Sequence, residues 1–398
     1  MAAMEKNNKT LNVPHLRFPE FSGEWEKCTI GDFGNIITGN TPPTADEENY
    51  ANGTHLWASP ADLGATKYIE STQTLLSDKG FDKTRAFPAH SILVTCIGST
   101  IGKIGMSKSA MASNQQINTI VPIRHDANFV YYAVQSRFPR YLSSIAVQAV
   151  PILSKSAFEK LDNFTTSKEE QIKIGNFLAL IDERIDTQRK IIEDIKKLKD
   201  AICNHNFTSG SSLMLGDVGC FVRGLTYSAS DVIDDTTGTA VLRSNNISNG
   251  ASVNFDELVW VNKTPNHEQR LRDGDIVICM ANGSSPLVGK ASYYIDGGIV
   301  SSTVGAFCGI YRSDNPLIKW LFQSRHYKQH IQRCIQGGNG AIANIYPEDI
   351  LAISFNIPAD HERLLNTLNS LEEKNLVEQK LLNRYLGVKY YLLSQIFI

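Results

Sequence analysis

The sequence predicts an α+β protein in which two similar globular domains are joined by two long helices that form an antiparallel coiled coil with pseudo-two-fold symmetry. Two observations carry this prediction. Segments of the first half recur in the second half about 184 to 192 residues later, which is far longer than the period of a solenoid repeat. Each mixed region is also followed by a proline-free stretch with apolar residues at spacings of four and three, the pattern of a coiled-coil helix.

Three pairs of segments define the repeat. TIGDFGNIITG at 29–39 aligns with MLGDVGCFVRG at 214–224, VYYAVQSR at 130–137 with IKWLFQSR at 318–325, and DER at 182–184 with EEK at 372–374. A chain duplicated in this way presents two similar surfaces, which suits a target with two half-sites. The predicted order is a disordered tail at 1–13, a first domain at 14–166, a first helix at 167–207, a second domain at 208–357 and a second helix at 358–398.

Composition excludes several classes of protein. The 398 residues carry a net charge of −2, so bulk attraction alone does not favour nucleic acid, although local basic patches can still bind it. The seven cysteines are scattered and form no CxxC pair, which argues against a zinc site or a disulfide framework and predicts reduced thiols in the cytoplasm. The sequence contains no apolar run of the roughly 20 residues that a membrane helix needs.

Short apolar runs between Gly, Pro, Asn and Ser turns predict the strands of both mixed regions. Residues 91–97 and 275–280 are expected to be matching buried strands. Residues 128–137 and 316–333 are expected to be helices, the second with Pro316 in its first turn.

The long helices are predicted from their seams. The first begins at a capping box formed by residues 167–170, and the polar residues Gln188 and Glu378 are expected to fix the register of the pair. The alternative is that each helix binds a partner protein. The residues predicted to pair the helices are Ile174, Leu178, Ile181, Ile185, Gln188, Ile192, Ile195, Leu364, Leu368, Leu371, Glu378, Leu382 and Tyr385.

The sequence segments that resemble catalytic motifs each lack a required residue or spacing. GSTIGK at 98–103 is one residue too short for a phosphate-binding loop, and its counterpart at 283–290 is one residue too long. TPPT at 41–44 lacks the polar residue and the aromatic residue of an amino-methyltransferase motif. His326 and His330 have metal-ligand spacing but lack the glutamate of HExxH. The chain is therefore predicted to be non-catalytic and to hold no metal or cofactor of its own.

The remaining signals concern binding. The amide-rich run at 113–118 carries side chains that can pair with adenine, although a polar turn that caps backbone groups is the alternative. The second half has other polar loops, and an offset of 188 places Ser302 and Thr303 opposite Asn114 and Gln115. Basic side chains on one predicted helix either contact phosphate or form a solvated face; they are Arg325, His326, Lys328, His330 and Arg333. The predicted DNA-contact residues are Ser99, Thr100, Lys103, Asn114, Gln115, Gln116, Arg223, Arg243, Asn245, Asn246, Asn282, Ser284, Lys290, Arg325, Asn339 and Asn344.

Four stretches of the sequence occur in the order of a known family: VPHLRFPEFSGEW at 13–25, Gly31-Asp32, the amide run at 113–115 and EEQ at 169–171, which opens a long helix. In these stretches the chain resembles the specificity subunits of type I restriction–modification enzymes. It implies two target-recognition domains, each reading one half of a split DNA sequence, and a helical spacer that sets the gap. It also implies two modification subunits carrying S-adenosylmethionine, and restriction subunits that use ATP and Mg²⁺.

Three alternatives remain at this stage. A duplicated scaffold could bind DNA or protein without methyltransferase partners, and steep salt dependence would distinguish DNA from protein. An enzyme with an unrecognised site is the third possibility.

Overall fold

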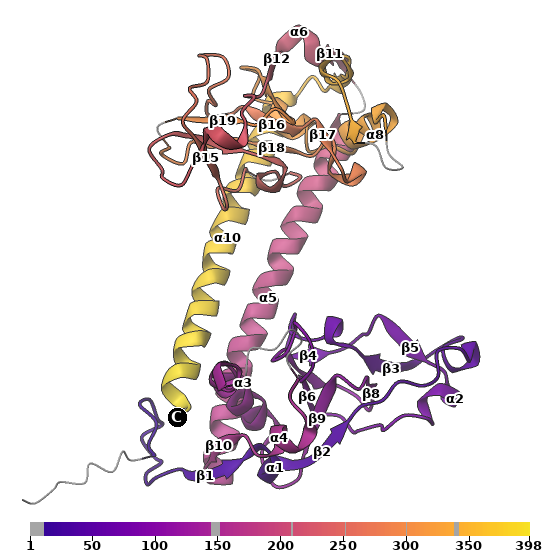
Figure 1. The fold of residues 1–398 in the computed structure, drawn as a ribbon, viewed down its shortest axis with the longest axis vertical. Helices are drawn as coiled ribbons and strands as arrows, with labels where there is room; N and C mark the ends of the chain where they lie inside the picture. Colours follow the sequence, from indigo (N-terminus) through magenta and orange to yellow (C-terminus); the bar gives the residue numbers. More distant parts are fainter. Residues whose placement is uncertain (1–11, 145–151, 208–209, 251, 300, 338–341) are drawn as a thin grey trace, which may run out of the picture. The chain divides into compact units, whose positions relative to one another are not determined.

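The computed structural model describes residues 12–144, 152–207, 210–250, 252–299, 301–337 and 342–398. The chain divides into two compact units (Figure 1). Unit 1 comprises Met1–Lys190 and Gln379–Ile398, and unit 2 comprises Ile191–Glu378. Most of the tail predicted at 1–13 lies outside the described residues.

Unit 1 is built on a five-stranded sheet of order β2-β9-β6-β7-β4, beside a three-stranded sheet β5-β3-β8 and the pair β1-β10. Every residue of β6 is buried, as the apolar run at 91–97 predicted. The strands are β1 (Glu26–Thr29), β2 (Gly34–Thr38), β3 (His55–Ala58), β4 (Tyr68–Ile69), β5 (Thr74–Leu76), β6 (Ile92–Thr95), β7 (Ile104–Ser107), β8 (Ala112–Ser113), β9 (Ile117–Pro122) and β10 (Asp162–Thr165).

The helices of unit 1 pack on that sheet and on the chain ends. Arg17 binds Glu170 at the start of α5 through both oxygens, at 2.7 and 2.8 Å. Glu170 therefore does not close the predicted capping box, although its backbone N–H does donate to Ser167 Oγ at 3.3 Å. The helices are α1 (Ile30–Phe33), α2 (Asp78–Phe81), α3 (Ala127–Ser144), α4 (Lys155–Glu159) and the first part of α5 (Lys168–Asn206), with short 3₁₀ turns η1 (Glu47–Asn49) and η2 (Pro60–Asp62).

Unit 2 repeats the plan of unit 1. Its sheet β12-β20-β16-β18 corresponds to β2-β9-β6-β7, β15-β14-β19 corresponds to β5-β3-β8, and β11-β22 corresponds to β1-β10. The duplication predicted from the sequence is thus present in the strand order. The strands are β11 (Ser211–Met214), β12 (Cys220–Arg223), β13 (Val232–Ile233), β14 (Thr239–Leu242), β15 (Val259–Val261), β16 (Ile276–Cys279), β17 (Ala281–Asn282), β18 (Ala291–Tyr293), β19 (Ser302–Val304), β20 (Cys308–Arg312), β21 (Ala343–Asn344) and β22 (Ser354–Ile357).

The single helix expected at 316–333 is two helices. The first ends at Leu321. Ser324 caps the second, because its Oγ accepts a hydrogen bond from the backbone N–H of Tyr327 at 3.2 Å. The helices of unit 2 are α6 (Leu215–Val218), α7 (Ile318–Leu321), α8 (Arg325–Cys334), α9 (Pro347–Leu351) and the first part of α10 (His361–Ile396), with 3₁₀ turns η3 (Ala229–Asp231), η4 (Ser244–Asn246) and η5 (Ser285–Leu287).

Each unit contains one half of α5 and one half of α10. In unit 1, Asp182 of α5 pairs with Lys389 of α10 at 2.6 Å. In unit 2, Lys199 of α5 pairs with Glu372 of α10 at 2.9 Å. The early part of one helix therefore contacts the late part of the other in each unit, which is the order of an antiparallel pair.

The predicted seam residues are all buried or half-buried. Those that are buried are Ile174, Leu178, Ile185 and Gln188 in unit 1 and Ile192, Ile195, Leu364 and Leu368 in unit 2. Those that are half-buried are Ile181, Leu371, Glu378, Leu382 and Tyr385. No helix among the described residues is long and apolar enough to cross a membrane.

Candidate nucleic-acid interface

One loop is held by the same backbone hydrogen bonds in both units. In unit 1, Asn114 N–H donates to Ala58 O at 2.9 Å and Cys96 N–H donates to Gln116 O at 2.7 Å. The loop follows β8 and precedes β9, so its ends are fixed by two different sheets.

The equivalent bonds of unit 2 identify the corresponding loop. Gly305 N–H donates to Leu242 O at 2.9 Å, and Met280 N–H donates to Phe307 O at 2.8 Å. This framework aligns residues 114–117 with 305–308. The sequence alignment that placed Ser302 and Thr303 opposite Asn114 and Gln115 is therefore wrong, since Ser302 and Thr303 lie in β19, the equivalent of β8.

A glycine brings the neighbouring chain against this loop in each unit. A Cβ on Gly39 would lie 2.2 Å from Ser113 O, and a Cβ on Gly224 would lie 2.1 Å from Gly305 O. Both approaches are too close for any side chain. The recurrence of glycine at the end of the first repeated segment is thus explained by the position of the loop.

In unit 1 the loop presents amide side chains. Asn114 is only 8% exposed, and its side-chain amide forms two hydrogen bonds with Gln116. Asn114 Nδ2 donates to Gln116 Oε1 at 3.1 Å, and the backbone N–H of Gln116 donates to Asn114 Oδ1 at 3.0 Å. Gln115 is exposed, and its Oε1 accepts from Thr41 Oγ1 at 2.5 Å. Asn114 therefore shapes the loop, while Gln115 is displayed on it.

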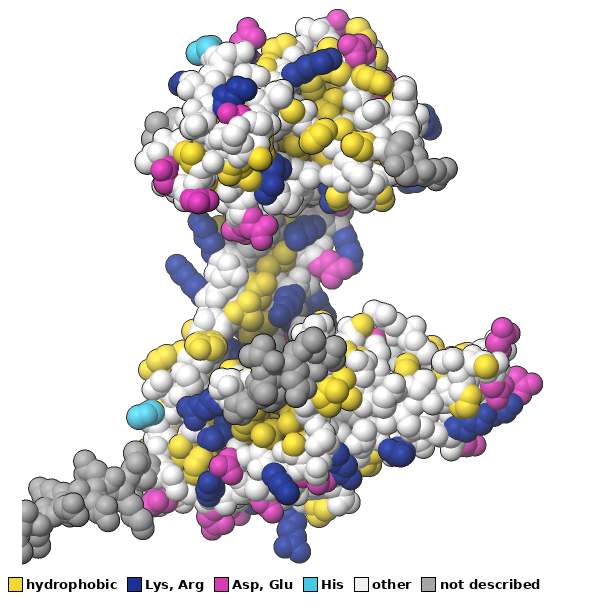
Figure 2. Space-filling model, in the orientation of Figure 1, with side chains coloured by type: hydrophobic (Ala, Val, Ile, Leu, Met, Phe, Trp, Pro, Cys, Tyr) yellow, Lys and Arg dark blue, Asp and Glu magenta, His cyan; other side chains and the backbone are white. Residues whose placement is uncertain are grey.

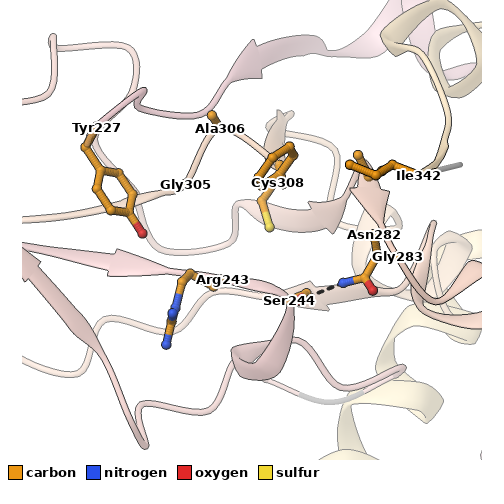
Figure 3. A pocket seen from close by; sticks show the side chains of 11 residues that line it. Tyr227, Arg243, Ser244, Asn282, Gly283, Gly305, Ala306, Cys308 and Ile342 are labelled. Carbon is orange, nitrogen blue, oxygen red and sulfur yellow. Dashed lines mark hydrogen bonds between the residues drawn. The ribbon is translucent and has the colours of Figure 1, made fainter. Parts of the chain in front are cut away.

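In unit 2 the loop borders a cavity of about 400 Å³ (Figure 3). Figure 3 shows Tyr227 on one side, Arg243 and Ser244 on another, and the sulfur of Cys308 pointing into the space between them. Phe307 is 65% exposed and Ile342 is 55% exposed. The lining residues are Tyr227, Arg243, Ser244, Ala281, Asn282, Gly283, Gly305, Ala306, Phe307, Cys308 and Ile342.

Two predicted contact residues, Arg243 and Asn282, lie in this cavity. Asn282 Nδ2 donates to Ser244 Oγ at 3.1 Å, and Asn282 Oδ1 accepts from Ser284 N at 2.9 Å. Asn282 therefore supports the rim, and Arg243 is the exposed cation beside it. Nearby Asn246 is fully buried, and its Nδ2 donates to the carbonyls of Asn254 and Asp256 at 2.9 and 2.8 Å.

The other predicted contacts are spread over several loops. In unit 1, Ser99 is exposed and Thr100 half-buried, and Lys103 Nζ donates to Pro60 O at 3.4 Å. In unit 2, Arg223, Asn245 and Ser284 are exposed and Lys290 is half-buried. Asn344 pairs with Gln336 through two backbone hydrogen bonds of 2.9 Å. Asn339 lies outside the described residues.

The basic cluster of α8 is separate from the cavity. Arg325 N–H donates to Asn204 Oδ1 at 2.7 Å, which places the start of α8 against the end of α5. His326 and His330 contact the carbonyls of Ser354 and Asp349 at 2.9 and 3.0 Å. Arg325, Lys328 and Arg333 are exposed, so α8 offers cations on a different part of unit 2.

A basic surface on the drawn face, or a cluster of metal ligands among the described residues, would be a sign of another site. On the face drawn in Figure 2, Lys and Arg side chains are interspersed with Asp and Glu and form no continuous basic surface. Among the residues that the structure describes, no group of three His, Cys, Asp or Glu side chains could hold a metal ion.

Of the lining residues, the predicted contacts include only Arg243 and Asn282. The large apolar side chains of Tyr227, Phe307 and Ile342 were missed because apolar residues in a loop carry no motif. The signal that finds Phe307 is the hydrogen-bond alignment with Gln116, which is visible only once the strands are paired. A frame that keeps its backbone contacts while exchanging amide for aromatic side chains is suited to reading two different sequences.

Comparison with protein families shows what part of the chain is similar to. A family model described as the type I restriction modification DNA specificity domain matches residues 22–197. The HindI specificity subunit of Haemophilus influenzae is 33% identical over 151 residues, covering 36% of this chain and 32% of that protein. The MjaIX specificity subunit of Methanocaldococcus jannaschii is 28% identical over 182 residues, covering 44% of this chain and 42% of that protein. The matched stretches thus span only 32–42% of these relatives.

Solved structures resemble the chain over most of its length. The S subunit of a type I restriction-modification system from M. genitalium gives a TM-score of 0.57 at 17% identity, covering 97% of this chain and 99% of that chain. A chain described under complex assembly and conformational transition of the type I R-M system gives 0.54 at 12% identity, covering 94% and 97%. At these identities the likeness shows the fold alone.

Proposed function

We propose that the whole chain is the specificity subunit of a type I restriction–modification complex, because the family model of the type I restriction modification DNA specificity domain matches residues 22–197. The mixed regions at 14–166 and 208–357 are the two target-recognition domains. Each reads one half of a split double-stranded DNA sequence. The helices at 167–207 and 358–398 set the gap between the halves.

The observation that carries this proposal is the shared loop frame. Residues 114–117 and 305–308 accept and donate equivalent backbone hydrogen bonds, yet they expose Gln115 in one unit and Ala306 and Phe307 in the other. Base edges are distinguished by hydrogen-bond donors and acceptors and by apolar contacts. Identical frames with different side chains are what two readers of unlike half-sites require.

The chemistry belongs to other subunits in this proposal. Two modification subunits bring S-adenosylmethionine, and restriction subunits bring ATP and Mg²⁺. The chain itself catalyses nothing and chooses the DNA. Such a complex works in the cytoplasm, where the DNA is.

The proposal combines base contacts with phosphate contacts. Gln115, Arg243 and Asn245 are the exposed candidates for base edges, and Arg325, Lys328 and Arg333 on α8 are candidates for phosphate. Phosphate contacts supply affinity, and base contacts supply specificity. Two linked readers gain avidity only when both half-sites stand at the right separation.

The test is the genome-wide adenine methylation pattern of the host with and without this gene. Loss of methylation at one split motif on deletion supports the proposal and gives both half-sites and the gap. A variant carrying Leu368→Asp, which places a charge in the buried seam, should lose the same methylation. Methylation that is unchanged by deletion would contradict the proposal in a host where the gene is expressed.

A further inference from the structure

We propose that Phe307 recognises the 5-methyl group of a thymine in the half-site read by unit 2. This inference rests on the proposed function, because it assigns a base to one of the two readers. Its support is the position of Phe307 in the loop frame, its exposure, and the cavity beside it.

The fold does not require an aromatic side chain at position 307, yet Phe307 is there and is exposed. The backbone carbonyl of Phe307 accepts a hydrogen bond from Met280 N–H at 2.8 Å. The carbonyl of Gln116 accepts the equivalent bond from Cys96 N–H at 2.7 Å in unit 1. The frame therefore accepts a polar or an aromatic side chain at this position. A ring that is 65% exposed contributes little buried area to folding, and it is free for contact with a ligand.

The surroundings of Phe307 are apolar on one side and cationic on the other. Ile342 is 55% exposed at the same cavity, and Tyr227 stands across it. Arg243 lies on the rim, where it can face phosphate or a guanine edge. A cavity of this composition is suited to bind a small apolar group that belongs to a negatively charged polymer.

Thymine is the base that offers such a group. In the major groove each base pair presents donors and acceptors, and the only methyl group of unmodified DNA is that on C5 of thymine. Contact of this methyl with a phenylalanine ring is a recognised form of base reading. Gln115 and Gln116 place amides at the corresponding loop of unit 1, so the two units differ in the chemistry they offer.

The test measures binding of the full chain, in complex with its modification subunits, to unmethylated DNA duplexes. These duplexes carry the split motif that is found methylated in the host. Each thymine of both half-sites is replaced in turn by uracil, which removes only the methyl group. We expect one position, in one half-site, at which uracil weakens binding about four-fold, the effect of losing one buried methylene-sized group. In Phe307→Gln, thymine and uracil at that position should bind equally.

Matched variants separate the contact from general damage. Ile295→Ala removes another exposed apolar side chain of unit 2 that does not line the cavity, and it should keep the full response to uracil. Phe307→Leu, which retains an apolar side chain, should keep part of it.

Failure of this inference differs from failure of the proposed function. Binding to the split motif with no uracil effect at any position, an uracil effect that persists in Phe307→Gln, or half-sites that contain no thymine would overturn the role of Phe307 alone. No preference of the complex for a split motif over unrelated DNA would overturn the proposed function.

Discussion

Asp182 and Lys389 form a buried ion pair that the chain repeats with Lys199 and Glu372. Asp182 Oδ1 lies 2.6 Å from Lys389 Nζ, and Glu372 Oε2 lies 2.9 Å from Lys199 Nζ. Both carboxylates and both lysines stand in equivalent positions of the repeat (182 to 372 and 199 to 389). Each helix therefore gives a carboxylate to one pair and a lysine to the other, as expected when the two helices are copies of one another and antiparallel within each unit.

A phenol from the globular part completes each pair. Tyr132 of α3 donates to Asp182 Oδ2 at 2.6 Å, and Tyr293 of β18 donates to Glu372 Oε1 at 2.6 Å. Burial opposes ionisation of Glu372, but the hydrogen bonds from Tyr293 and Lys199 prevail and hold its pKa below the usual value. The two tyrosines come from different elements, so the same cluster arises from unlike parts of the two units.

Removing one partner of the buried pair should destabilise unit 1. Lys389→Met leaves Asp182 without its cation in a site where the two side chains are 10% and 15% exposed. We expect a loss of about 2 to 4 kcal/mol, because an uncompensated buried charge is costly. Calorimetric unfolding measures it. Glu193→Gln, which breaks an exposed pair with Lys197, is the control and should change stability by less than 1 kcal/mol. Equal effects of the two variants would count against the buried pair.

Lys67 should make stability rise with pH in the alkaline range. It is 4% exposed, its Nζ lies 2.6 Å from Asn128 Oδ1 and 3.2 Å from Tyr132 OH, and burial lowers the pKa of Lys67 to about 8. Between about pH 8 and 10.5 the unfolded chain holds a proton on this lysine that the folded chain has lost. Stability therefore increases with pH through this window.

A comparison with Lys67→Met isolates this lysine from the tyrosines and from Asp182 and Lys389, which also face it. The wild type should gain about 2 kcal/mol relative to that variant between pH 7.5 and 10, measured by urea unfolding. Lys160→Met, an exposed substitution in the same unit, should show no such gain. A flat difference for Lys67→Met would show that the lysine stays charged when the chain folds.

The sequence alone predicts the structural features whose residues recur with a regular period. The seam of α5 and α10, the buried strands β6 and β16, and the recurrence of Gly39 as Gly224 all follow from patterns that survive without knowledge of contacts. Burial of alternating or heptad positions has a fixed geometry, so a list of apolar residues predicts it.

The loop contacts could not be predicted, because hydrogen bonding and not similarity fixes their alignment. The offset between equivalent residues is 184 at Thr95 and Cys279, 187 at Gly102 and Gly289, and 191 at Asn114 and Gly305, as paired backbone hydrogen bonds show. Each loop insertion shifts the alignment without leaving a motif. Nor does the sequence reveal that the amides of Asn114 and Asn246 are hydrogen-bonded within the fold, since the residue type alone does not distinguish a buried asparagine from an exposed one.

Adding a Cβ at the glycine beside each loop should affect one half-site only. Gly39→Ala would press on Ser113 O and displace the loop of unit 1, and Gly224→Ala would do the same at Gly305 O in unit 2. We expect each variant to lose discrimination at one half-site by about ten-fold or more, since one good base contact contributes about 1 to 3 kcal/mol. Binding to duplexes mutated in one half-site at a time measures this.

The control for the two alanines is Gly387→Ala in α10. A Cβ there meets no atom within 4 Å, and alanine favours a helix over glycine by up to about 1 kcal/mol. This variant should be more stable and should read both half-sites normally. Gly39→Ala and Gly224→Ala that both affect the same half-site would contradict the assignment of one reader to each unit.

Lengthening both helices by one heptad should change the gap and leave the half-sites unchanged. Seven residues are about two helical turns, so paired insertions after Gln188 in α5 and after Glu378 in α10 keep the apolar seam in phase. They add about 10 Å of helix, the length of roughly three base pairs at 3.4 Å each. If the helices measure the gap, the preferred spacer grows by about three base pairs, and binding to spacer-length variants of the motif detects it. Paired insertions of two residues turn the seam out of phase and should abolish binding to every spacer. An unchanged spacer preference in the seven-residue variant, with both half-sites still read, would show that something other than α5 and α10 sets the distance.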